Sequence, residues 1–130
     1  MIVNDTEIMS EKKSIIKDNS FAFAIRVINL YKHLAEAKKE FLLSKQLLRS
    51  GTSIGALVRE AQNAESSKDF VHKLGIAQKE CDETVYWLEL LKDTDYITHT
   101  EFQSIHHDAT ELLRMIKSAI ITTKNKTQNP

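Results

Sequence analysis

The stretch DFVHKLGIAQKECDETVYWLELL, Asp69 to Leu91, decides the fold because its apolar residues recur at three- and four-residue steps. This spacing places one apolar stripe along a helix, made of Phe70, Leu74, Ala77, Cys81, Val85 (or Thr84), Leu88 and Leu91. Ser66 and Ser67 precede the stripe and can cap the helix, and the polar residues 93–95 end it. We therefore predict a helix between these limits.

Three further segments carry a helical pattern. One runs from about Asn19 to Lys38, one from about Glu40 to Ala64, and one starts at a capping box formed by Thr98 and Glu101. Short connections force neighbouring helices to run antiparallel. We predict an all-α, antiparallel up-down-up-down four-helix bundle over residues 19–122, with a flexible N-terminal arm at 1–18 and a frayed polar tail at 123–130.

The composition narrows the class of protein. Of the 130 residues, 42% are hydrophobic and 28% charged, as in an ordinary globular domain, and three Gly and one Pro are too few for an all-β fold. No run is long enough to span a membrane, and the first eleven residues are acidic, unlike a signal peptide. A single cysteine, Cys81, excludes an intrachain disulfide. We expect a cytoplasmic protein without membrane contact.

If the helix after Ser66 folds back on the helix that ends near Ala64, with the turn at Glu65, residues equally far from the turn lie side by side. Gly55 then faces Gly75 and Ile76, so we expect Gly51, Gly55 and Gly75 to permit close helix approach. The same construction pairs Arg49 with Asp82 and Glu83 in a structural ion pair. If that pair is partly buried, loss of the arginine costs several kcal/mol, on the order seen for broken buried pairs.

Catalytic and metal-binding patterns are weak in this chain. His99, Gln103 and His106 share a helix face, and His107 lies one turn from Glu111, but exposed histidines on polar faces are the more common explanation. Cys81 falls on the apolar stripe beside acidic residues, which favours a structural role. We expect no enzyme activity, no cofactor, no metal and no small-molecule substrate.

Charge is distributed unevenly along the chain, although 18 basic and 18 acidic residues balance overall. Residues 12–59 carry a net charge of +7 and residues 60–111 a net charge of −8. One interpretation is a surface for RNA or DNA phosphates made of Lys38, Lys39, Lys45 and Arg59. The other, favoured by the zero net charge, is that the basic helices pair with the acidic one within or between subunits.

Tyr86, Trp87 and Leu90 extend apolar surface beyond the single stripe of their helix. Aromatic residues are enriched in contacts between subunits, so these three form a candidate oligomer interface. The alternative is a wide core face inside a monomer.

Two stretches together resemble a known family: Asp69 to Leu91, and a second stretch from Gln46 to Ala61, QLLRSGTSIGALVREA. Together they resemble the four-helix bundle proteins encoded in intervening sequences of bacterial 23S rRNA genes, a family that includes the accessory variability determinant of diversity-generating retroelements. The similarity covers residues 20–97. The matching positions are Gln46, Arg49, Ser53-Ile54, Glu60, Glu80, Glu83 and Tyr86-Trp87-Leu88.

The resemblance implies a closed ring of bundles, typically a homopentamer, without catalytic activity and with nucleic-acid binding as a candidate activity. Leu57 stands where the family usually has Asn, and the near-neutral charge departs from the basic retroelement members, so a reverse-transcriptase partner is not expected. We predict a non-catalytic homo-oligomeric binding or scaffold module, with RNA as the best-supported ligand. The alternative is a protein-protein interaction adaptor that binds no nucleic acid.

Overall fold

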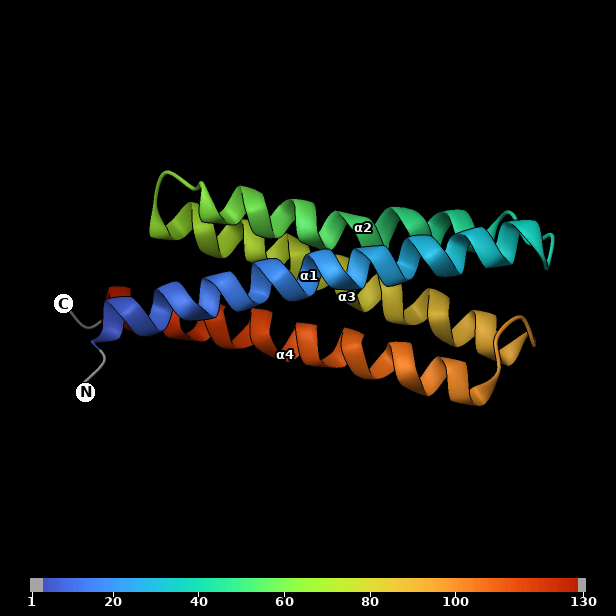
Figure 1. Ribbon diagram of the computed structural model, residues 1–130. Helices are drawn as coiled ribbons and strands as arrows, with labels where there is room; N and C mark the ends of the chain where they lie inside the picture. Colours follow the sequence, from blue (N-terminus) through green and yellow to red (C-terminus); the bar gives the residue numbers. More distant parts are fainter. Residues whose placement is uncertain (1–3, 129–130) are drawn as a thin grey trace.

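The computed structural model describes residues 4–128, which form four α-helices. These are α1 (Asp5–Glu36), α2 (Leu43–Gln62), α3 (Ser67–Asp93) and α4 (His99–Gln128). The start of α1, the end of α4 and the α2–α3 loop lie at one end of the molecule, and the other two loops lie at the opposite end (Figure 1). We call these the terminal end and the loop end. The predicted up-down-up-down four-helix bundle is confirmed.

The core forms where the apolar stripes of the helices meet. On α3 the buried residues are Phe70, Leu74, Ala77, Cys81, Thr84, Leu88 and Leu91. The sequence leaves open whether Val85 or Thr84 belongs to the buried stripe, and the structure places Thr84 there. Its hydroxyl donates to the Glu80 carbonyl at 2.8 Å and contacts the Ser50 hydroxyl of α2 at 2.9 Å. The polar atom is therefore satisfied inside the core.

The helix starts that the sequence indicates are capped as expected. Ser66 accepts a hydrogen bond from the Asp69 backbone N–H at 3.1 Å. At the start of α4, the Thr98 hydroxyl accepts from the Glu101 N–H at 3.1 Å, and the Glu101 carboxylate accepts from the Thr98 N–H at 2.8 Å. This reciprocal pair is the predicted capping box, and its hydrogen bonds lower the pKa of Glu101.

The two terminal segments differ from the prediction. Helix α1 begins at Asp5, with the Asn4 side chain accepting from the Glu7 N–H at 2.8 Å, so residues 5–18 are helix and not a flexible arm. Helix α4 continues to Gln128, and Thr123, 7% exposed, donates from its hydroxyl to the Ala119 carbonyl at 2.8 Å. The frayed tail is therefore wrong for residues 123–128. Residues 1–3 and 129–130 lie outside the described residues.

The turn between α1 and α2 is organised by Glu40, which is 7% exposed. Its carboxylate accepts from the backbone N–H groups of Leu42, Leu43 and Ser44 at 2.9, 2.8 and 2.7 Å. Burial acts to raise the pKa of Glu40, but these hydrogen bonds outweigh it and the pKa is lowered. Glu40 thus caps α2 from outside the helix, which starts at Leu43 and not at Glu40.

Two of the three glycines allow close helix approach, but between α1 and α2 and not between α2 and α3. A Cβ on Gly51 would come within 2.7 Å of the Val27 methyl groups, and one on Gly55 would lie 3.4 Å from the Ser20 carbonyl oxygen. A Cβ on Gly75 would meet nothing within 4 Å. The predicted approach of Gly55 to Gly75 is therefore wrong, since α1 occupies that side of Gly55.

Candidate functional site

The ion pair of Arg49 joins α2 to α3. Its guanidinium contacts Glu83 and lies 3.2 Å from the Glu80 carboxylate, while Asp82 is exposed and forms no ion pair with it. The predicted partner Asp82 is thus replaced by Glu80, because residues three apart share a helix face. The Arg49 side chain is 50% exposed, so the contact is a surface pair and not a partly buried one. Such pairs contribute about 1 kcal/mol or less.

The candidate phosphate-contacting residues do not form one patch. Lys38 and Lys39 lie in the α1–α2 turn at the loop end, and Lys45 lies in the first turn of α2. Arg59 is fourteen residues further along α2, about 21 Å away by helix rise, where its guanidinium carbon lies 5.4 Å from the centre of the Phe21 ring. The three lysines are exposed and form no ion pair within the part of the chain that the structure describes.

Two large apolar side chains that lie between Lys39 and Lys45 in the sequence are also exposed. Phe41 is 49% exposed and Leu42 is 80% exposed. They belong to a turn, where hydrophobic periodicity carries no signal, and so sequence pattern alone does not single them out. We call the group formed by Lys38, Lys39, Phe41, Leu42 and Lys45 the basic tip.

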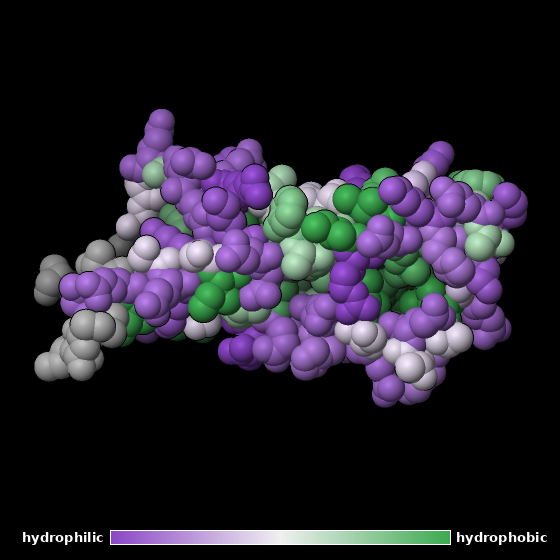
Figure 2. Space-filling model, in the orientation of Figure 1, coloured by the Kyte–Doolittle hydropathy of each residue, from purple (hydrophilic) through white to green (hydrophobic). Residues whose placement is uncertain are grey.

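Apolar side chains are also exposed on two helices that lie diagonally across the bundle. On α1, Phe21 and Ile25 are 54% and 45% exposed one helical turn apart. On α3, Tyr86 is 53% exposed and Leu90, four residues on, is partly exposed. Helix α1 packs against α2 and α4 but not α3, so these two faces point to opposite sides among the described helices. Figure 2 shows hydrophobic residues emerging in the middle of the face that α1 and α2 present.

Trp87 is packed differently from its neighbour Tyr86. The two rings meet edge to face with centroids 5.0 Å apart, but Trp87 is partly buried against the core. Its indole Nε1 is buried and finds no hydrogen-bond acceptor within residues 4–128. Of the three residues predicted for an oligomer interface, Tyr86 offers the most exposed surface.

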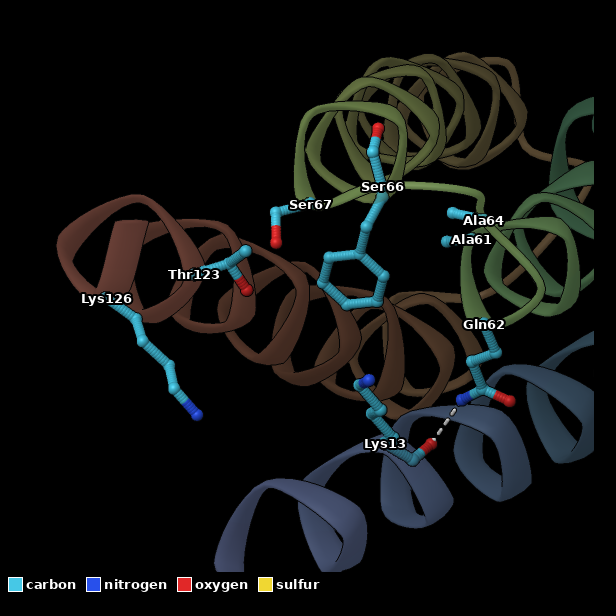
Figure 3. A pocket seen from close by; sticks show the side chains of 9 residues that line it. Lys13, Ala61, Gln62, Ala64, Ser66, Ser67, Thr123 and Lys126 are labelled. Carbon is cyan, nitrogen blue, oxygen red and sulfur yellow. Dashed lines mark hydrogen bonds between the residues drawn. The ribbon is translucent and has the colours of Figure 1, made fainter. Parts of the chain in front are cut away.

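A pocket of about 350 Å³ opens at the terminal end, where all four helices contribute side chains (Figure 3). Lys13 of α1 lies with its Nζ 5.0 Å from the centre of the Phe70 ring, and its carbonyl accepts from the Gln62 amide at 2.6 Å. The Ser66 and Thr123 hydroxyls are engaged in helix hydrogen bonds. The lining residues therefore include no nucleophile paired with a base.

The histidines and the cysteine do not assemble into a reactive site. Across residues 4–128, no three His, Cys, Asp or Glu side chains converge to hold a metal ion, and the His106 ring stacks on Phe102 at 4.9 Å. Burial raises the pKa of Cys81 to about 12, and its thiol donates to the Ala109 carbonyl at 3.3 Å. Cys81 is thus a protonated core residue.

None of the helices over the described range is long and apolar enough to cross a lipid bilayer.

The chain belongs to the family of 23S rRNA-intervening sequence proteins, whose model matches residues 12–118. A similar solved structure is a protein of unknown function from the S23 ribosomal protein family of Bacteroides thetaiotaomicron. It shares 54% sequence identity with this chain, covering 84% of this chain and 97% of the other, with a TM-score of 0.83. The comparison with curated proteins found no match. The family membership expected from Gln46–Ala61 and Asp69–Leu91 is confirmed.

Proposed function

We propose that the protein is a non-catalytic bundle that assembles into a homo-oligomeric ring, with a pentamer favoured by the family resemblance, and that the ring is a scaffold for RNA. The observation that carries the assembly is the pair of apolar faces on opposite sides of the bundle. Phe21 and Ile25 form one face and Tyr86 and Leu90 the other.

Two different faces on opposite sides favour a head-to-tail contact. A two-fold dimer pairs one surface with itself, whereas two unlike surfaces join in a chain of subunits that closes when the rotation allows it. Gly75 supports this arrangement, because it lies three helical turns from Tyr86 on the outer side of α3 with open space before it. A glycine there lets a helix of the next subunit approach closely.

The basic tip supports RNA as the ligand of the scaffold. Its three lysines are exposed and form no ion pair among the described residues 4–128, and a ring repeats them in every subunit. Repetition raises the effective affinity of weak phosphate contacts without any new contact within one subunit. The chain as a whole has no net charge, so binding depends on this local concentration of lysines.

The assembly is tested by light scattering with Phe21→Glu and Tyr86→Glu. The wild type is expected to exceed the 14.9 kDa of one chain severalfold, and each variant to be a monomer. A mixture of the two variants is expected to form dimers, because the intact face of one joins the intact face of the other. Ile121→Glu, at another exposed position on α4, serves as the control. A wild-type protein that stays at one chain's mass at micromolar concentration would refute the ring.

RNA binding is tested by titrating a labelled structured RNA at two salt concentrations. Binding through several phosphates is expected to weaken steeply as salt rises. Absence of binding even at low salt would refute the RNA scaffold and favour the protein-interaction adaptor, whose affinity for its partner would depend little on salt.

A further inference from the structure

We infer that the basic tip binds unpaired nucleotides, with the ring of Phe41 stacked on a base and the neighbouring lysines on phosphates. This inference rests on the proposed function, because it names the class of RNA that the tip would recognise.

The composition of the basic tip matches this ligand. Half of the Phe41 surface is open, and Leu42 beside it is 80% exposed. Lys38, Lys39 and Lys45 flank them along the chain and are exposed, whereas Glu40, the acidic residue next to Phe41 in the sequence, is buried with its carboxylate oriented toward backbone N–H groups. An aromatic ring bordered by cations is the usual arrangement at sites for single-stranded nucleic acid.

The conformation of the tip is set before any ligand arrives. The Glu40 N–H donates to the Leu34 carbonyl at 2.9 Å, and the Ser44 hydroxyl donates to the Glu40 carbonyl at 2.7 Å. Between α1 and Glu40, Lys39 takes a left-handed backbone with φ of 56°. The turn is therefore fixed on both sides, and a ring presented from a fixed turn loses little conformational entropy on binding.

The geometry favours unpaired over paired nucleotides. Bases in a duplex are stacked on each other, so a protruding ring has no base face to contact, whereas bases in loops and single strands are open to stacking. Glu101 of α4 reduces the positive field beside Lys38: hydrogen bonds to Thr98 are the main cause of its lowered pKa, and the charges of His33 and Lys38 lower it further. Lys39 and Lys45 form no ion pair within residues 4–128.

The experiment uses the full chain and two labelled probes of equal length, an oligouridine of about 12 nucleotides and an RNA duplex of about 12 base pairs. Fluorescence anisotropy is expected to show tighter binding of the oligouridine. Phe41→Ala is expected to weaken that binding about tenfold while the salt dependence stays the same. Lys45→Gln is expected instead to reduce the slope of affinity against salt by about 0.7.

Two variants separate stacking from simple apolar contact. Phe41→Tyr keeps the ring and is expected to keep the binding, whereas Phe41→Leu keeps apolar bulk and is expected to lose it. Ile121→Ala, an exposed hydrophobic position away from the tip, serves as the control and is expected to bind like the wild type. Circular dichroism and light scattering establish that each variant is folded and keeps the wild-type mass.

Several results would overturn the inference, and they differ from failure of the proposed function. Equal binding of duplex and oligouridine, or wild-type affinity in Phe41→Ala, would leave RNA binding standing but remove the stacking role. A lower oligomer mass in Phe41→Ala would make Phe41 an interface residue. Binding to phosphatidylserine vesicles that depends on Leu42, without RNA binding, would assign the tip to a lipid surface. No RNA binding by any form of the protein would refute the proposed function itself.

Discussion

Gly51 of α2 lies directly against Val27 of α1, so that a methyl group on Gly51 would come within 2.7 Å of both Val27 methyl carbons. Val27 is fully buried, so any shift of its methyl groups would have to displace other core side chains. The contact sets how closely the first two helices approach, and it makes Gly51 different in kind from Gly75, which faces open space.

Gly51→Ala is expected to destabilise the fold by about 1–2 kcal/mol, because overpacking outweighs the gain in helix propensity. Both substitutions are made in the Tyr86→Glu variant, which is expected to be a monomer, because the proposed assembly brings a neighbouring subunit close to Gly75. In that background Gly75→Ala is the matched control and is expected to stabilise the bundle by up to about 1 kcal/mol, since it gains the same propensity without a clash inside the subunit. Urea unfolding of both variants gives the comparison. Equal effects of the two substitutions would show that the Val27 contact does not set the helix spacing.

Glu40→Ala is expected to cost about 2 kcal/mol, because three backbone N–H groups at the start of α2 lose their acceptor. Thermal unfolding measures the loss, at about 4 °C for each kcal/mol in a chain of this size. Glu36→Ala, at an exposed position at the end of α1, is the control and is expected to change the melting temperature little. A melting temperature of Glu40→Ala equal to that of the control would contradict the capping role.

The same carboxylate predicts an acid-sensitive part of the stability. The pKa of Glu40 is lower in the folded protein than its ordinary value of 4.5, so the ionised form stabilises the folded state. This contribution is complete above the unfolded value and is lost as pH falls through the lowered pKa. The stability difference between wild type and Glu40→Gln is therefore expected to shrink as the pH falls below the ordinary pKa of 4.5. Urea midpoints measured from pH 7 down to pH 3 test this, and a constant difference would contradict it.

Arg49→Ala is expected to lower stability by about 1 kcal/mol or less, because the side chain is half exposed and its pairs with Glu80 and Glu83 are screened. Thermal unfolding at low and high salt measures the effect, which should fade in high salt. A loss of many degrees that persists in high salt would mean that assembly buries this pair.

Cys81 is expected to resist thiol reagents in the folded protein. Burial raises the pKa of the thiol to about 12, so almost no thiolate exists at pH 8, and the side chain is fully buried. Labelling with a chromogenic disulfide should therefore follow unfolding and accelerate with urea. Fast labelling of the native protein would contradict this burial.

Much of the bundle could be predicted because its signals are local and repeated. The stripe from Phe70 to Leu91 and the Thr98–Glu101 capping box each depend on residues within a few turns of one another. The start of α1 could not be predicted in this way, because its first turns leave Ile8 and Ile15 exposed and so show no one-sided pattern. Nor could the role of Glu40, whose hydrogen bonds depend on the path of the turn.

The contacts between helices were predicted less well than the helices themselves. Folding α3 back on α2 at Glu65 places Arg49 beside the correct turn of α3. The distance from the loop does not tell, however, which face of a helix points to which neighbour. For that reason the construction predicts that Gly55 faces α3, whereas in the structure it faces Ser20 of α1. The separation of Arg59 from Lys38 and Lys39 follows from the length of α2 and could have been derived from helix rise.

Trp87 is the single tryptophan of the chain, and its buried indole N–H, beside the exposed ring of Tyr86, finds no acceptor among residues 4–128. A buried indole emits at shorter wavelength than one that water or another polar group reaches. The intrinsic fluorescence of Trp87 therefore reports binding at this side of α3 without any added label. Docking of a second subunit against Tyr86 would then shift the wavelength of tryptophan emission, which can be followed without a separate measurement of mass.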